Sequence, residues 1–277
     1  MIAVLGGAVV LLVAPVAYQL LTWPDVAALA ERPPESSAFI DTYRARRRAG
    51  GEHDRVAWTW VPWSAISVHL KRAAVSAEDM EFFSHGGFSG TEMRAALRDA
   101  LKEGDLRGAS TITQQLAKNL WLSPSRNPWR KVKELLLARS LERHLTKERI
   151  LAIYLNVVEF GPAVYGAEAA ARTYYGKPAA DLTEHEAAML AAGLPRPSTW
   201  HPGSESRAYL RYVEDIEGRM ARAQFLWRRL GAAPPAVPES LVIPDSLWVP
   251  ESRLVVPPES LPDTSTIPPR DSVPAPT

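Results

Sequence analysis

Residues 107–119 read RGASTITQQLAKN. Thr111 and Gln114 have the spacing of a capping box, so this stretch predicts a helix that begins just after Thr111. On that helix Gln114 and Lys118 share one face. The apolar residues form a different stripe: Ile112, Leu116 and Leu120. Backbone amides at the helix start, with the Lys118 charge one turn along, would suit an anion, whereas the alternative is an ordinary amphipathic helix with a well-formed cap.

The section around this helix is strongly basic. Residues 107–149 hold ten Lys or Arg against three acidic residues, an excess of seven in a chain whose net charge is +1. Such an excess suits a phosphorylated or pyrophosphorylated ligand, although a charge run is commonly a solvated helix face. Within it, Glu134 has Arg130 and Lys131 as helical neighbours, which should keep it ionised and suit electrostatic positioning. The alternative for Glu134 is a simple intrahelical salt bridge.

A second polar stretch, residues 78–87, reads EDMEFFSHGG. Glu78 lies at the end of a predicted apolar helix and precedes two aromatic residues. Partial loss of solvent there would raise the pKa of the Glu78 carboxyl and suit a general base or acid. By local chemistry alone, a solvated acid pair at a helix end is the stronger interpretation. His85, beside two glycines, is either a metal ligand or, more commonly, a hydrogen-bonded structural group.

Composition limits what the chain can be. Its 277 residues are 46% hydrophobic and 23% charged, which is typical of a globular protein and leaves room for one sizeable domain. The net charge of +1 gives no argument for nucleic-acid binding. Zero cysteines exclude disulfides, thiolate metal sites and a cysteine nucleophile.

The two ends of the chain differ from its centre. Residues 2–23 carry no charged side chain, and this length matches the ~20 residues that span a bilayer as a helix. An uncleaved anchor is favoured over a cleaved signal peptide because the apolar run is long and no clear cleavage site follows. At the other end, 12 of the 24 prolines lie between Pro234 and Pro276, which predicts a disordered or flexible tail. The expected division is an anchor, a polar connector, one folded domain and the tail: 1–23, 24–57, 58–232 and 233–277.

The central section is apolar at helical spacing and has few strand-like alternations, so the fold class is mainly α. Ser64 is the expected cap of a helix that ends near Glu78. Asn127 followed by Pro128 predicts the start of a helix that continues through Leu145. Gly161 and Gly166 mark an expected loop. Further helices are predicted over 147–156, 167–174, 183–192 and 207–229.

Taken in order, these stretches resemble the peptidoglycan glycosyltransferases of glycosyltransferase family 51, and the chain as a whole resembles its monofunctional members. The resemblance covers roughly residues 58–232. It is carried by five ordered motifs: Glu78-Asp79 through Phe82 and His85 to Gly87; Gly108 to Leu116 with Lys118-Asn119; Arg130-Lys131 with Lys133-Glu134; Ile150-Leu151 with Tyr154-Leu155-Asn156, Phe160-Gly161, Tyr165-Gly166 and Ala169 to Ala171; and Ala187 to Leu194 with Pro195 and Pro197.

The resemblance implies a lysozyme-like helical domain at the outer, periplasmic face of the plasma membrane. There it would polymerise lipid II onto a glycan chain held by undecaprenyl diphosphate, with inversion. Glu78 would be the general base, and Glu134 would position the donor directly or through a divalent cation such as Mg²⁺ or Mn²⁺; no cofactor is certain. The residues implied to bind substrate are Ser110, Gln114, Gln115, Lys118, Arg126, Arg130 and Lys133. The residues implied to support the site without binding substrate are Asp79, Phe82, His85, Asn119 and Asn156.

The sequence departs from the family pattern at three positions, and other functions are also compatible with it. Ser89, Ala95 and Ala152 replace an acidic, a basic and a glutamate residue common in the family, so the family's acceptor contacts are not carried over to residues 89–95. No lysine has a serine three positions before it, which excludes an S-x-x-K transpeptidase. The alternatives are a lytic murein enzyme of similar fold, with a protonated Glu as acid, and a non-catalytic anchored scaffold. The candidate protein partners are other cell-wall synthesis or division proteins.

Overall fold

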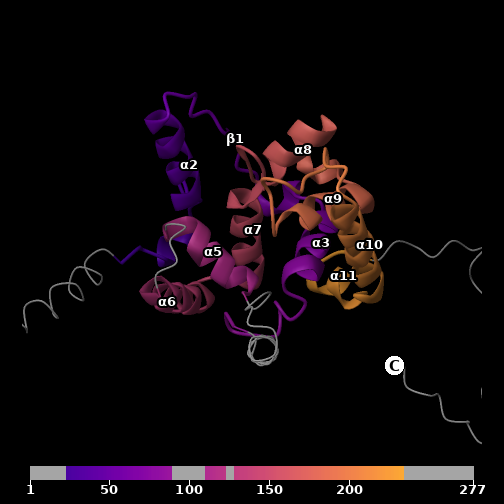
Figure 1. Ribbon diagram of the computed structural model, residues 1–277. Helices are drawn as coiled ribbons and strands as arrows, with labels where there is room; N and C mark the ends of the chain where they lie inside the picture. Colours follow the sequence, from indigo (N-terminus) through magenta and orange to yellow (C-terminus); the bar gives the residue numbers. More distant parts are fainter. Residues whose placement is uncertain (1–22, 89–109, 123–127, 234–277) are drawn as a thin grey trace, which may run out of the picture. The chain divides into compact units, whose positions relative to one another are not determined.

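The computed structural model describes residues 23–88, 110–122 and 128–233 (Figure 1). Within these ranges the chain is mainly helical, as expected. Its α-helices are α2 (Ala38–Ala49), α3 (Val68–Glu78), α5 (Ile112–Trp121), α6 (Pro128–His144), α7 (Lys147–Val157), α8 (Ala167–Tyr175), α9 (Glu184–Gly193), α10 (Arg207–Arg222) and α11 (Phe225–Arg229). Three short 3-10 helices are η1 (Ala27–Ala30), η2 (Trp63–Ala65) and η3 (Ala179–Asp181).

Several predictions fall outside the described residues. These are the apolar segment 2–22, the tail from residue 234, the substrate residue Arg126, the helix cap Asn127 and the departures between residues 89 and 95. Among the helices that the structure does describe, none is both long and apolar enough to cross a bilayer.

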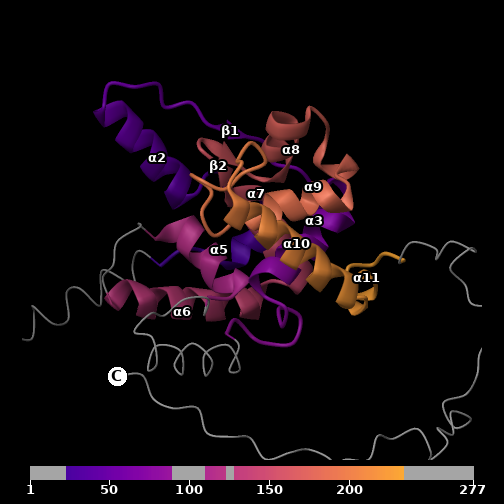
Figure 2. The ribbon, with the colours of Figure 1, turned by 45° about the vertical axis from the view of Figure 1, so that its right-hand side comes forward.

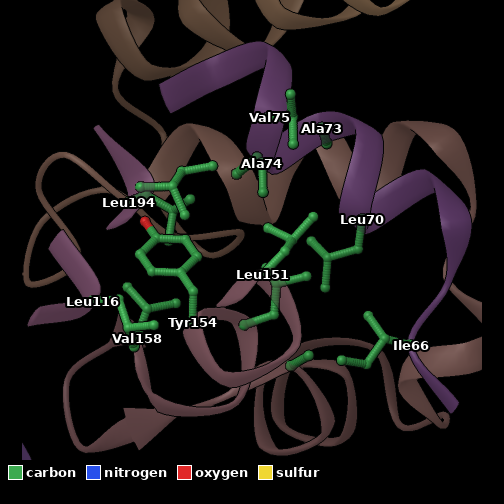
Figure 3. Close-up of a cluster of buried hydrophobic side chains, with 14 of the residues drawn as sticks. Ile66, Leu70, Ala73, Ala74, Val75, Leu116, Leu151, Tyr154, Val158 and Leu194 are labelled. Carbon is green, nitrogen blue, oxygen red and sulfur yellow. The ribbon is translucent and has the colours of Figure 1, made fainter. Parts of the chain in front are cut away.

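Helix α7 is buried on every side after its first turn, and it organises the core. Its residues from Ile150 to Val157 are all buried, and a helix that is apolar all round belongs in an interior. Figures 1 and 2 place α7 between the α5–α6 pair and the group of α3, α9 and α10. The close-up in Figure 3 shows Leu151 and Tyr154 of this helix among Leu70 of α3 and Leu116 of α5. The core therefore ties together the helices that carry Glu78 and Gln115.

Helix α3 ends at Glu78, as the sequence predicted, but it begins later than expected. The expected cap, Ser64, lies in the short η2 turn instead. The cap is Ser67, whose side chain accepts a hydrogen bond from His69 N at 3.1 Å. Leu70, Ala73 and Ala74 are fully buried, so the apolar face expected from the sequence does pack into the core. Helix α3 packs chiefly on α9 and also contacts α10.

A small sheet replaces the loop that Gly161 and Gly166 were expected to mark. Its strands are β1 (Ala57–Trp58), β2 (Glu159–Gly161) and β3 (Val164–Tyr165), in the order β1-β3-β2. Strand β3 pairs parallel with β1 and antiparallel with β2. The strands are too short for an alternating pattern to be visible in the sequence, and the long-range pairing of β1 with β3 has no local signal. The loop prediction was therefore wrong.

Residues 24–57, expected as a polar connector, are partly folded. Val26 and Leu29 are buried in the main hydrophobic core, and Leu29 O accepts a hydrogen bond from Arg149 Nε at 2.6 Å. Helix α2 is capped by Ser37 and packs against α5. Scattered apolar residues in a polar stretch thus attach this segment to the helices that follow it.

Near the end of the described chain, the single helix predicted over 207–229 is two helices. Helix α10 ends at Arg222, and α11 begins at Phe225. Ala223 between them has φ −86° and ψ 51°, a conformation outside the helical region. Both segments still bury apolar side chains, which is why the hydrophobic pattern continues through the break.

Candidate active site

Glu78 is the last residue of α3, and its carboxylate faces α5. Gln115 Nε2 of α5 donates to Glu78 Oε2 at 2.6 Å. The carbonyl side of the same amide, Gln115 Oε1, accepts from the Tyr154 hydroxyl of α7 at 3.0 Å. Three helices therefore meet at one partly buried carboxylate.

Burial raises the pKa of the Glu78 carboxyl. The hydrogen bond from Gln115 and the charge of Lys118 oppose this shift, while the neighbouring charge of Asp79 adds to it. The sequence favoured a solvated acid pair here, and that interpretation is wrong because Asp79 is buried and Glu78 is largely removed from solvent; the alternative, a raised pKa, is confirmed. A carboxylate of this kind is a stronger base than a solvated one, which suits proton transfer near neutral pH.

Asp79 and His85 hold the loop that follows α3. Both carboxylate oxygens of the buried Asp79 lie 2.9 Å from His85 Nε2, and Asp79 Oδ2 also accepts from Ile112 N at 3.0 Å. His85 Nδ1 in turn accepts from Gly87 N at 3.1 Å. His85 is thus the hydrogen-bonded structural group that the sequence favoured. Phe82 is fully buried beneath this loop.

The start of α5 is fastened to that loop. Thr111 caps the helix as predicted, accepting from Gln114 N at 3.3 Å. The second half of the expected capping box is different, because Gln114 Nε2 donates at 3.2 Å to Gly87 O, which also accepts from Thr111 Oγ1 at 2.8 Å. The amides of Ile112 and Gln114 are occupied by Asp79 and Thr111. These two amides are therefore not free for an anion, in agreement with the ordinary capped helix that was the alternative interpretation of the sequence.

Glu134 of α6 is 3% exposed and is paired with two cations of its own helix. Arg130 Nη1 lies 3.1 Å from Glu134 Oε2, and Lys131 Nζ lies 2.5 Å from Glu134 Oε1. The sequence predicted both neighbours. Lys131 does more than the sequence indicated, because its ammonium also contacts Gln114 Oε1 at 3.1 Å and Ser110 Oγ at 3.3 Å. It therefore joins α6 to the start of α5.

A divalent cation does not fit Glu134 as the structure has it. Both of its carboxylate oxygens face cationic side chains. Across the described ranges, no group of three His, Cys, Asp or Glu side chains is arranged to hold a metal ion. Metal ligation at Glu134 would require the Arg130 and Lys131 pairs to open, and we derive no step through a metal.

Lys118 connects the two halves of the site. Burial lowers the pKa of its ammonium. The charges of Glu134 and Glu78 oppose that shift, so both carboxylates lie within electrostatic reach of one ammonium group. The Lys118 ammonium also lies 5.8 Å from the centre of the Phe39 ring of α2, within the range of a cation–π contact. The acid at the end of α3 and the basic helix α6 therefore face a common residue.

The remaining expected residues lie at different depths. Gln114 is buried, and both ends of its amide bond to protein groups. Asn119 is also buried. Asn156 holds the segment after β1, because its side chain bonds Val61 N at 2.9 Å and Val61 O at 3.0 Å. Lys133 lies partly exposed on α6 beside Glu134.

Sequence reasoning missed two residues around Glu78, and it named Tyr154 in a family motif without giving it a role there. Tyr212 and Arg219 of α10 both interact electrostatically with Glu78, and the Tyr212 hydroxyl donates to Ala77 O at 3.2 Å. Tyr154 reaches it through Gln115. These residues lie far from Glu78 in sequence, so local spacing gave no signal for their convergence.

Comparison with known proteins identifies the family. The family model described as Transglycosylase matches residues 44–221, more than half of the chain. The chain belongs to the transglycosylase family. Proteins named biosynthetic peptidoglycan transglycosylase are similar over most of their length. That of Methylobacillus flagellatus is 41% identical over 219 residues, covering 79% of this chain and 96% of the relative. That of Nitrosospira multiformis is 44% identical over 191 residues, covering 69% and 83%.

Membership accounts for the order of the site motifs. The match spans α3, α5, α6 and α7, the four helices that carry Glu78, Gln115, Glu134 and Tyr154. It also begins at residue 44, inside α2, so part of the expected connector lies within the family's own domain.

Proposed function

We propose that the chain is a peptidoglycan glycosyltransferase that polymerises lipid II into β-1,4-linked glycan strands and releases undecaprenyl diphosphate. Family membership and the names of its relatives support the reaction class. The observation that carries the proposal is that the buried Lys118 of α5 interacts electrostatically with both Glu78 and Glu134. The proposed base and the acid of the basic helix α6 therefore share one cation.

In this proposal Glu78 is the general base. Its carboxylate takes the proton of the acceptor 4-hydroxyl while that oxygen bonds to the anomeric carbon of the donor. The bond from the anomeric carbon to the diphosphate oxygen breaks, and the diphosphate leaves with the electron pair, which inverts the configuration. A sugar hydroxyl is a weak nucleophile, so a positioned base contributes roughly 10²–10⁴-fold to the rate. The raised pKa of Glu78 supports this role.

The leaving diphosphate would be stabilised by the basic residues near Glu134. Lys118 and Arg130 are the described cations best placed for this, and Lys133 lies on the same helix. Preorganised cations stabilise charge that develops in the transition state. Glu134 would hold Arg130 and Lys131 in place, and Ser110 would orient the sugar or phosphate groups. Gln115, whose amide bonds Glu78 and Tyr154, would orient the base instead. Arg126 remains a prediction from the sequence.

The enzyme is proposed to act at the periplasmic face of the plasma membrane, held by a single span within residues 1–23. A membrane anchor would raise the effective concentration of the enzyme near a lipid-linked substrate. The boundaries at 24–57, 58–232 and 233–277 likewise remain predictions, as do partnerships with other cell-wall or division proteins.

A lytic murein enzyme is the second candidate, because the raised pKa of Glu78 would also suit a general acid. A hydrolase would have no use for cations gathered around Glu134, so the polymerase is favoured. Incubating the purified protein separately with labelled lipid II and with finished peptidoglycan distinguishes the two. We expect high-molecular-weight glycan from lipid II and no fragments from the finished polymer; soluble fragments without polymer would instead establish the lytic reaction.

A further inference from the structure

Three side chains from three helices form a continuous hydrogen-bonded chain that ends at the proposed base. The Tyr154 hydroxyl lies 3.0 Å from Gln115 Oε1, and Gln115 Nε2 lies 2.6 Å from Glu78 Oε2. Gln115 Nε2 also lies 3.4 Å from Ser110 O. The Gln115 amide therefore has an acceptor at one end and a donor at the other, and each end has a defined partner.

Tyr154 is built into the core and cannot turn away from this contact easily. Its side chain is fully buried, and its ring lies in the apolar cluster with Leu116 and Leu194 (Figure 3). Burial raises the pKa of the Tyr154 hydroxyl far above its ordinary value, so the group stays protonated and keeps its proton to donate.

That proton selects one orientation of the Gln115 amide. When the Tyr154 hydroxyl donates, the amide oxygen must face Tyr154, and the NH₂ group must then face Glu78. The reversed amide would direct its oxygen at an ionised carboxylate, which is repulsive. The Tyr154 hydroxyl and the Glu78 carboxylate therefore favour the same orientation from opposite ends.

We propose that Tyr154 is a positioning residue for Glu78, acting through Gln115 to fix the orientation and stabilise the ionised form of the base. This inference rests on the proposed function, in which Glu78 accepts the proton of the acceptor hydroxyl. Tyr154 itself would touch neither substrate nor the reacting atoms. Its contribution would be to keep one N–H bond directed at one carboxylate oxygen.

Other charged and titratable groups face Glu78 and remain in place when Tyr154 changes. They are Asp79 beside it, Lys118 on α5, and Tyr212 and Arg219 on α10. A substitution that removes the Tyr154 hydroxyl and keeps its ring leaves these groups unaltered. Any change in the titration of Glu78 would then report the loss of the contact through Gln115.

The test compares Tyr154→Phe with Tyr209→Phe. Tyr209 is a matched control because it is equally buried and its hydroxyl also donates to a buried acceptor, Met189 O at 2.8 Å, with Met189 Sδ at 3.7 Å, without contacting Glu78. Both variants should lose some thermal stability. In lipid II polymerisation, Tyr154→Phe should lower kcat roughly 2- to 10-fold, the net worth of one hydrogen bond, with KM little changed. Tyr209→Phe should leave kcat as in the wild type.

The pH profile separates positioning from a structural role. Glu78 must be ionised to act as a base, so the rate falls as pH falls through its pKa. Weaker support of the ionised form raises that pKa, so the acid limb of kcat should move to higher pH in Tyr154→Phe and not in Tyr209→Phe. In a Gln115→Met background, Tyr154→Phe should produce no further shift. The proposal would be overturned if the acid limb of kcat did not shift in folded Tyr154→Phe. It would also be overturned if Tyr154→Phe shifted the limb equally in the Gln115→Met background.

Two additional measurements complete the test. The Glu78 carboxyl can be titrated by NMR in resting ¹³C-labelled enzyme, identified by its absence in Glu78→Gln. If Tyr154→Phe shifts the pKa of Glu78 in this titration while Glu78→Gln polymerises at the wild-type rate, Tyr154 still positions Glu78, but Glu78 is not the base. If Tyr154→Phe does not fold, a fluorinated tyrosine at position 154 supplies a stronger donor and should move the limb to lower pH; an unmoved limb would again overturn the role of Tyr154.

Discussion

Lys131 Nζ lies 2.5 Å from Glu134 Oε1, so the ammonium group is paired with the buried acid one turn further along α6. The same ammonium lies 3.1 Å from Gln114 Oε1, so the pair also joins α6 to α5. Lys131 thus links Glu134 to the start of the helix that carries Gln115.

Glu134→Gln should therefore impair both the site and the fold. Loss of the carboxylate leaves Arg130 and Lys131 without their acid and close to Lys118, and we expect polymerisation to fall at least tenfold. Because Lys131 is partly exposed, the free energy of unfolding should fall by only about 1–3 kcal/mol. Steady-state assays and urea unfolding measure the two effects. Glu168→Gln, which loses a comparable pair with Arg172 at 2.8 Å, should retain polymerisation; equal loss in both variants would argue against a role for Glu134 in the site.

Glu78 should make the fold less stable as pH rises. Burial sets its folded pKa above the unfolded value of about 4.3, so between these two values the folded state binds more protons. The free energy of unfolding then falls as pH rises through this window. Glu78→Gln removes the cost of ionising a buried carboxyl, so its stability relative to the wild type should rise as pH rises above about 4.3, as measured by urea unfolding. A pH-independent difference would show that Glu78 titrates normally.

Asp79→Asn should loosen the loop after α3. One carboxylate oxygen accepts from His85 Nε2 at 2.9 Å and the other from Ile112 N at 3.0 Å. Asparagine has only one side-chain oxygen, so one of these two donors would lose its acceptor. We expect the free energy of unfolding to fall by about 1–3 kcal/mol and activity to fall with it. Chemical denaturation is the measurement. Asp181→Asn, at the exposed end of η3, serves as the control and should change stability little.

Gly166→Ala should be far more damaging than Gly176→Ala. Both glycines have positive φ, at 81° and 68°. A Cβ at Gly166 would lie 2.5 Å from Asn156 O, whereas a Cβ at Gly176 would meet nothing within 4 Å. We expect a loss of roughly 1 kcal/mol at Gly176 and roughly 3 kcal/mol or more at Gly166. Comparable melting temperatures for the two variants would contradict the close contact at Asn156.

Features determined by neighbouring residues were predictable from the sequence. The Thr111 cap, the end of α3 at Glu78 and the pairing of Glu134 with Arg130 all depend on residues within four positions of one another. Helical periodicity likewise predicted a mainly helical fold. The raised pKa of Glu78 was only the weaker of two interpretations, because the burial that causes it comes from helices distant in sequence.

Features determined by distant residues were not predictable. The pairing of β1 with β3 joins Ala57 to Val164, and the contact between Tyr154 and Gln115 crosses 39 positions. Thr111 has a suitable capping partner in Gln114, yet that side chain bonds Gly87 O because the loop after α3 packs against it. Tertiary contacts therefore decided where a locally competent group would bond.

The most direct test of the account is polymerisation of labelled lipid II by Glu78→Gln, with Glu214→Gln on the exposed face of α10 as the control. Glutamine retains the size of the side chain and cannot take a proton from a sugar hydroxyl. The account predicts that Glu78→Gln folds and forms polymer at least 10²-fold more slowly than the wild type, while Glu214→Gln polymerises normally. Polymer formed by Glu78→Gln at the wild-type rate would contradict the assignment of Glu78 as the base.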